Sequence, residues 1–134
     1  MGLILIMTDS ERGHPEIYRT LSLKDETVEV HAFKEAHDLV KDCMVDIILL
    51  DCNVDVDAGL KLLKENKTVC PHVPNIFLSN AKHEGVVLKA FRAGARDFFR
   101  KPLDIQELRS TIKGLLRVKR SPQENRSPFI KGDA

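Results

Sequence analysis

A chain of 134 residues, of which 43% are hydrophobic and 31% charged, has the composition of one globular domain with a hydrophobic core. Its 21 basic and 20 acidic side chains nearly cancel, so the net charge gives no general attraction to nucleic acid or to a membrane surface. No apolar run approaches the roughly 20 residues that span a bilayer, and the apolar start at residues 3–7 is too short for a signal peptide. We therefore expect a cytoplasmic protein without a membrane segment.

The cysteines and histidines follow no metal-binding pattern. Cys43, Cys52 and Cys70 have neither CxxC nor Cys/His ligand spacing, which is typical of reduced structural thiols. The five histidines are scattered along the chain, and we expect none of them to bind a metal.

The first part of the chain alternates predicted strands and helices. Residues 3–7 are an unbroken apolar strand that ends at Thr8, Asp9 and Ser10. Pro15 begins a predicted helix that ends near Leu21, because proline is tolerated in the first turn. Residues 27–33 are β-branched and alternating, which predicts a strand, and residues 35–41 have helical spacing.

The stretch "VDIILLDCNVDVDAGL", residues 45–60, contains the most informative strand. Residues 47–50 are all apolar, which is typical of a strand buried on both faces in a parallel sheet. The strand ends in Asp51. Because ligands of open parallel sheets bind outside the carboxyl ends of the strands, Asp51 is the first candidate for a functional residue.

Alternation continues to the last helix. The predicted elements are a helix entered at Gly59, a strand at residues 76–78, a helix at 86–93 that stops at Gly94, a strand at Phe98 and Phe99, and a helix capped by Asp104 with Glu107 at capping-box spacing. Five successive strand–helix units predict a parallel sheet with helices on both faces and right-handed crossovers.

The composition changes near the C-terminus. Residues 119–134 contain two RSP triplets, several charges and little to bury, which predicts a disordered tail or linker stub after a domain at residues 1–118. A nucleic-acid-binding arm is the alternative, but the segment has no recognition helix and no interleaved aromatic residues.

Polar side chains follow four of the predicted strands, and they should meet at one edge of the sheet. They are Asp9, Asp51, Ser79 and Lys101. Carboxylates and oxygen ligands suit Mg²⁺, lysine binds phosphate as a point charge, and Asp51 can act as a nucleophile that forms an acyl phosphate. Each residue also has a purely structural interpretation, as a turn former or a helix cap, but these do not explain why all four follow strands.

The sequence resembles the response regulator receiver domain of two-component signalling, over residues 3 to about 117. The resemblance rests on "LILIMTD", "DIILLDCNVDVDAGL", "NIFLSNA" and "KAFRAGARDFFRKPLDIQEL", four motifs in the family's order. It implies a flavodoxin-like, doubly wound α/β fold with five parallel strands in the order 2-1-3-4-5 and five helices. It also implies a cis peptide bond between Lys101 and Pro102.

The resemblance further implies a role for each site residue. Asp51 would accept a phosphoryl group from a histidine kinase or phosphotransfer protein, and Mg²⁺ would be held by Asp9, Asp51 and the Asn53 backbone carbonyl. Ser79 and Lys101 would bind the phosphoryl oxygens, and Ser79 with Phe98 would form the switch. Packing alone is the alternative role for Phe98. The chain would act as a signalling module and not as an enzyme with turnover.

The resemblance also implies partners. An output domain after residue 134 is one candidate, and a second copy of the chain is another, through the face made by the fourth helix, fifth strand and fifth helix. Direct contact with nucleic acid or membrane is not expected.

Three positions depart from the family pattern. Thr8 replaces the first of two adjacent acids, which should weaken Mg²⁺ binding. Asp55 stands where proline is usual and is interpreted as a solvated loop residue. The alternative is that Asp55, with Asp57 nearby, restores negative charge to the rim of the site. Asn80 stands where a small residue is usual. These departures motivate a second hypothesis, a pseudo-receiver that binds a partner without phosphorylation. A third, an aspartate-dependent phosphatase, would require an acid where Asn53 stands.

Overall fold

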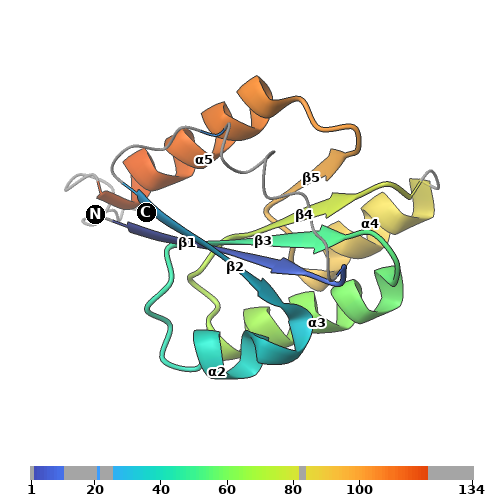
Figure 1. Cartoon of the computed structure of the whole chain (residues 1–134), viewed down its shortest axis with the longest axis horizontal. Helices are drawn as coiled ribbons and strands as arrows, with labels where there is room; N and C mark the ends of the chain where they lie inside the picture. The colour runs from blue at the N-terminus through green and yellow to red at the C-terminus, as the bar shows by residue number, and fades with distance from the viewer. Residues whose placement is uncertain (1, 11–20, 22–25, 82–83, 121–134) are drawn as a thin grey trace, which may run out of the picture.

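The computed structural model describes residues 2–10, 21, 26–81 and 84–120 (Figure 1). Its five strands are β1 (Gly2–Thr8), β2 (Glu26–Ala32), β3 (Ile47–Cys52), β4 (Asn75–Ser79) and β5 (Asp97–Arg100). Its helices are a 3-10 turn η1 (Phe33–Glu35), α2 (Ala36–Val40), α3 (Val56–Val69), α4 (Glu84–Ala93) and α5 (Ile105–Arg120).

The five strands form one parallel sheet in the order β2-β1-β3-β4-β5. This is the order expected for the flavodoxin-like fold, and it confirms the predicted sheet. The continuous apolar runs in β1 and β3 arise because both strands are central, with a hydrophobic layer on each face. The edge strand β2 instead has no fully buried residue, as expected of a partly solvated strand.

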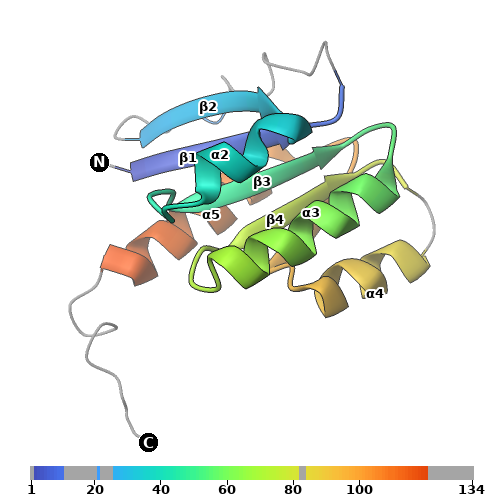
Figure 2. The same ribbon diagram turned by 90° about the horizontal axis from the view of Figure 1, so that it is seen from below.

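Helices cover both faces of the sheet. In Figures 1 and 2, α2, α3 and α4 lie on one face and α5 lies on the other. Successive strand residues alternate between these layers, so Leu50 of β3 packs under α2, α3 and α4, whereas Leu49 packs under α5. Leu108 and Ile112 of α5 are fully buried in the second layer.

Most predicted elements agree with the structure. The described residues contain four α-helices, and the predicted helix at residues 15–21 lies outside them except for its last residue. That residue, Leu21, is buried in the α5 layer, and its carbonyl accepts a hydrogen bond of 2.7 Å from Arg109 Nε. Helix α5 continues to Arg120, past the predicted domain boundary at residue 118. The predicted tail lies outside the described residues from position 121 onward.

The predicted helix termini at Gly94 and Asp104 are confirmed. Gly94 has φ +113°, a conformation that side chains rarely adopt, directly after the last residue of α4. Asp104 accepts a hydrogen bond of 3.1 Å from the backbone N–H of Glu107, as an N-cap does.

Helix α3 packs unusually close to the sheet at Gly59. A β-carbon at this position would lie 2.2 Å from Cys52 Sγ and 3.2 Å from the ring of Phe77. The helix itself begins at Val56, before the predicted entry at Gly59, so the glycine serves close packing and not helix entry.

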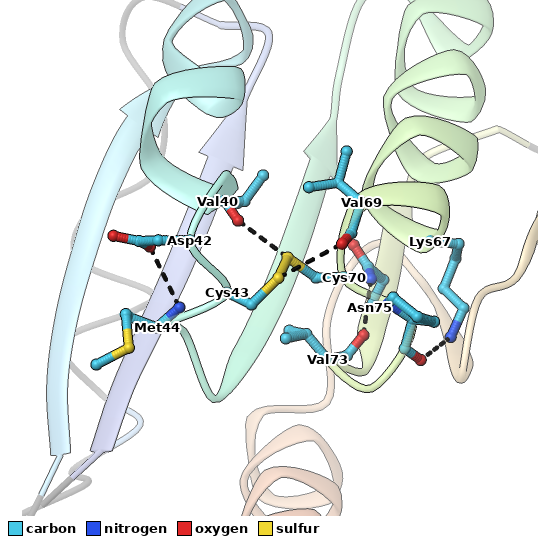
Figure 3. The surroundings of a disulfide bond; sticks show 10 residues. Val40, Asp42, Cys43, Met44, Lys67, Val69, Cys70, Val73 and Asn75 are labelled. Carbon is cyan, nitrogen blue, oxygen red and sulfur yellow. Dashed lines mark hydrogen bonds between the residues drawn. A yellow bond between two sulfur atoms is a disulfide. The ribbon is translucent and has the colours of Figure 1, made fainter.

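The expectation of three reduced cysteines is wrong for two of them. Cys43 and Cys70 form a disulfide that joins the segment after α2 to the C-terminal end of α3 (Figure 3). The two positions are 27 residues apart, and the pairing depends on the chain bringing these two segments together at the amino edge of the sheet. Cys52 is free and buried, as predicted.

Within the part of the chain that is described, no helix has the length and apolar character needed to cross a membrane.

Candidate functional site

The carboxyl ends of the central strands bring the candidate residues to one edge of the sheet. Thr8 of β1 lies opposite Asp51 of β3, and Cys52 of β3 lies opposite Ser79 of β4. Ser79 in turn lies opposite Arg100, the residue before Lys101. The parallel register therefore aligns the ends of β1, β3, β4 and β5, as the sequence predicted.

Asp51 lies at the centre of this edge. Its side chain is fully buried, and one carboxylate oxygen accepts a hydrogen bond from Lys101 Nζ. Lys101 Nζ also donates to the side-chain oxygen of Asn53, and Asn53 Nδ2 lies 3.3 Å from the other Asp51 oxygen. A buried carboxylate needs such partners, because an unpaired charge is costly away from water.

Asp9 holds the loop that follows β3. Its two carboxylate oxygens accept backbone hydrogen bonds from Asn53, Val54 and Asp55, at 2.8, 2.9 and 2.8 Å. Burial alone would raise the pKa of Asp9, but these hydrogen bonds, with a further one from the Asn53 amide, hold the pKa below its usual value. Asp9 is therefore a stable anion that fixes the loop beside Asp51.

Ser79 and Lys101 are joined through the backbone. The Lys101 N–H donates to the Ser79 carbonyl at 2.9 Å, and the Lys101–Pro102 peptide is cis, as the resemblance implied. The Ser79 hydroxyl is fully buried and accepts a hydrogen bond of 3.0 Å from the Ala81 N–H. In this arrangement Lys101 points to Asp51, and Ser79 contacts its own loop.

Phe98 is partly buried on the α4 side of the sheet, where its ring stacks on Phe77 with centroids 5.8 Å apart. The neighbouring Phe99 is buried in the α5 layer. The two rings therefore lie on opposite faces of the sheet, as successive residues of a strand do.

Three residues that depart from the family pattern have distinct surroundings. Thr8 is buried, and its hydroxyl accepts a hydrogen bond of 3.1 Å from the Ser10 N–H, so it shapes the turn next to Asp9. Asn80 is exposed. Asp55 is the N-cap of α3, because its carboxylate accepts a hydrogen bond of 3.0 Å from the Ala58 N–H. Asp55 is thus an exposed loop residue, as predicted, and it has the additional role of capping α3.

The donor atoms at this edge fit a hard divalent cation. Two carboxylates, Asp9 and Asp51, are bridged by the Asn53 amide, which lies 3.5 Å from Asp9 and 3.3 Å from Asp51. Mg²⁺ commonly uses one or two carboxylates and completes its shell with water and phosphate oxygens. Among the described residues no group of three or more His, Cys, Asp or Glu side chains gathers as a metal site.

One feature of the site was missed by sequence reasoning. The side chain of Asn53 contacts Asp9, Asp51 and Lys101, whereas only its backbone carbonyl was predicted to matter. Its position, two residues after Asp51, places both side chains on the same side of an extended chain, which is the signal that could have shown it. Beside the site, burial raises the pKa of the Cys52 thiol, with the carboxylates of Asp9 and Asp51 adding to the shift. It is an inert packing residue.

Comparison with known proteins identifies the family. The response regulator receiver domain profile matches residues 4–113. The transcriptional regulatory protein KdpE of Staphylococcus aureus is 32% identical over 98 residues, which cover 73% of this chain and 42% of KdpE. The chain thus spans less than half the length of that relative.

Two solved structures share the fold. A two-component response regulator from Clostridium difficile has a TM-score of 0.78 and 22% identity, covering 90% of this chain and all of that one. An atypical orphan response regulator, described as having a phosphorylation-independent regulatory mechanism, has a TM-score of 0.71 and 20% identity, covering 86% of this chain and 95% of its own. With five parallel strands in the order 2-1-3-4-5 and a matching family profile, the chain belongs to the response regulator receiver domain family.

Proposed function

We propose that this receiver domain accepts a phosphoryl group on Asp51, with Mg²⁺, from a histidine kinase or phosphotransfer protein, and so switches a partner or output surface. The observation that carries the proposal is the contact of Lys101 Nζ with the buried Asp51 carboxylate, at the edge where Asp9 is also held. One nucleophile, one cation and one further carboxylate are the groups that phosphoryl transfer requires.

In the proposed step a carboxylate oxygen of Asp51 attacks phosphorus. The P–N bond of the phosphohistidine breaks as the P–O bond to Asp51 forms, and the electron pair leaves with the imidazole. Phosphoryl transfer needs positioning and charge stabilisation more than covalent chemistry from the protein. Lys101 is placed to move from the Asp51 oxygen to the incoming phosphoryl oxygens, and the Ser79 hydroxyl is a second hydrogen-bond donor at the same edge.

Asp9, Asp51 and the Asn53 backbone carbonyl would hold Mg²⁺, which supplies charge stabilisation to the phosphoryl oxygens. Both oxygens of Asp9 already accept backbone hydrogen bonds, so Mg²⁺ binding requires these oxygens to be shared between the backbone N–H groups and the ion. Together with the loss of one acid at Thr8, this sharing predicts weak Mg²⁺ binding in the absence of a phosphoryl group.

Phosphorylation would shift a population between two packings. Ser79 would exchange its hydrogen bond from Ala81 for one to the phosphoryl group. The partly buried ring of Phe98, stacked on Phe77, would then repack. The ring belongs to β5 and lies on the α4 side of the sheet, so the change would reach this end of the domain. The face made by α4, β5 and α5 is the proposed site for an output domain or a second copy.

The proposal makes the protein a signalling module without turnover on external substrates. Its relatives are transcriptional and other regulatory proteins that are longer than this chain, so an output domain is part of the proposal. So is the cytoplasmic location predicted from the sequence. Disulfides are rare in the cytoplasm, whereas the structure contains the Cys43–Cys70 bridge. Alkylating the free thiols inside cells and counting the modified cysteines tests the location: three modified cysteines would fit the cytoplasm, and one would fit an oxidising compartment.

The test is phosphorylation of the purified chain by acetyl phosphate and Mg²⁺, followed by intact-mass measurement. The wild type should gain one phosphoryl group, and Asp51→Asn should gain none. Asp38→Asn is the matched control, because Asp38 is an exposed acid on α2. Equal labelling of wild type and Asp51→Asn would refute the assignment of Asp51. No labelling of any variant at millimolar Mg²⁺ would favour a pseudo-receiver, and steady hydrolysis of unrelated monoesters would favour a phosphatase.

A further inference from the structure

A groove of about 540 Å³ lies between α3 and α4, on the face of the domain away from α5. Figure 2 shows the two helices side by side. Four basic side chains line the groove, Lys61 and Lys64 from α3 with Lys89 and Arg92 from α4, and one acid, Asp57. The helices thus present two cations each to the same hollow.

The charge of this groove is unusual for the molecule. Four positive charges against one negative leave a formal charge of +3, whereas the whole chain has a net charge of +1. Among the described residues, none of these four cations forms an ion pair. Like charges that face one another without a counter-charge repel. A bound anion would relieve this repulsion and would be attracted by all four cations.

Size and lining favour a small anion over a polymer. The volume falls within the range of about 300–1,000 Å³ that is typical of small-molecule sites. Between the cations lie Leu60 and Ala93, which are 9% and 8% exposed and form an apolar floor. Such a floor suits the organic part of a ligand, while lysines bind phosphate as point charges and Arg92 offers a two-pronged donor.

We propose that the groove between α3 and α4 is a binding site for a small ligand with two or more phosphate groups, of the nucleoside polyphosphate class. The site is separate from Asp51, and none of its lining residues belongs to the proposed phosphoryl-transfer machinery. It begins at Asp57, in the first turn of α3, directly after the loop whose N–H groups bind Asp9.

The test uses the full chain labelled with ¹⁵N, titrated with inorganic tripolyphosphate and with ATP, without Mg²⁺. Amide shifts should concentrate on α3 and α4, and binding should weaken as salt rises. The double variant Lys61→Gln/Lys89→Gln should weaken binding by roughly tenfold or more, because charge-assisted hydrogen bonds are among the strong ones. Lys41→Gln/Lys113→Gln, with two exposed lysines outside the groove, is the matched control and should bind as the wild type does.

Two further variants separate this site from others. Asp57→Asn should tighten binding, because it removes the one carboxylate of the groove. Asp51→Asn should leave binding unchanged; loss of binding in this variant would place the phosphate at the Asp51 edge and overturn the proposal. Unfolding curves establish that each variant is folded.

Three other outcomes would overturn the inference. The first is no shift with either probe at millimolar concentration. The second is equal weakening in the groove variant and its lysine control, which would indicate diffuse surface charge. The third is equal affinity for an acidic peptide of matched charge, which would make the groove a protein-docking surface and not a phosphate site.

Discussion

Reduction of the Cys43–Cys70 bridge should destabilise the domain by an amount that follows from its place in the chain. The bridge closes a loop over a sequence separation of 27 residues. In the chain-entropy account, such a loop lowers the entropy of the unfolded chain by about 12 cal/mol/K, which corresponds to about 3.5 kcal/mol at about 25 °C. Marginal domains have total stabilities of about 5–15 kcal/mol, so the loss would be large.

The local structure explains why chain entropy should dominate. Cys70 Sγ lies 2.9 Å from the Val40 carbonyl oxygen and Cys43 Sγ lies 3.5 Å from that of Val69 (Figure 3). Each thiol therefore has an acceptor within reach once the bond is reduced by two electrons and two protons. Because both thiols keep a hydrogen-bond acceptor nearby, the native structure should change little on reduction.

The assay is urea unfolding of the wild type with and without a reductant, compared with Cys43→Ser. The reductant should lower the free energy of unfolding of the wild type by about 3.5 kcal/mol and leave the variant unchanged. Alkylation of the denatured, unreduced wild type should modify one cysteine, Cys52. Three modified cysteines would show that the bridge is absent, and a midpoint that the reductant does not move would show that it does not stabilise the fold.

Three further predictions concern packing, capping and pH. Gly59→Ala should lower the free energy of unfolding by about 1–3 kcal/mol, because the added β-carbon would overlap Cys52 Sγ. The control Gly114→Ala, on the open side of α5, should instead raise the free energy of unfolding by up to about 1 kcal/mol. Equal effects of the two substitutions would contradict the close packing at Gly59. Asp55→Ala removes the α3 N-cap and should cost about 1 kcal/mol in urea unfolding; an unchanged midpoint would exclude the capping role. Hydrogen bonds from His31 to Glu29 and Glu35 raise the pKa of His31 above 6.5, although its partial burial opposes the shift. These hydrogen bonds should therefore stabilise the folded state below pH 6.5, and the stabilisation should be lost as the pH rises through the pKa of His31 in the folded protein. At pH 6 the free energy of unfolding of His31→Gln should therefore be lower than that of the wild type, by no more than about 1 kcal/mol, and in alkaline buffer the two values should converge. A difference that widens as the pH rises would show that these hydrogen bonds do not favour the protonated imidazole.

The sequence predicts the sheet well because the signal is local to each strand. Residues 47–50 are apolar on both faces, and this pattern fits only a central strand covered by two layers. Once the strands are known to be parallel, their carboxyl ends must share an edge. The meeting of Asp9, Asp51 and Lys101 follows from that topology without knowledge of any side-chain conformation.

Features that depend on where loops and neighbouring helices meet could not be predicted. The Cys43–Cys70 pairing joins two loops, and spacing in the chain carries no information about their distance. The α3–α4 groove needs two helices side by side, so its cations look like ordinary solvated residues in the sequence. The capping role of Asp55 was not predicted, because the start of the helix was placed at Gly59 and not at Val56.

Phosphoryl acceptance at Asp51 is tested most directly by titrating the ¹⁵N-labelled chain with Mg²⁺ and beryllofluoride, which imitates a phosphoryl group on a carboxylate. We predict saturable shifts at Asp51, Ser79 and Lys101, with changes spreading through Phe98 to α4 and α5, and no such shifts in Asp51→Asn. Identical spectra with and without beryllofluoride at millimolar Mg²⁺, or identical responses of wild type and Asp51→Asn, would contradict the claim that these strand ends form one phosphoryl-accepting site.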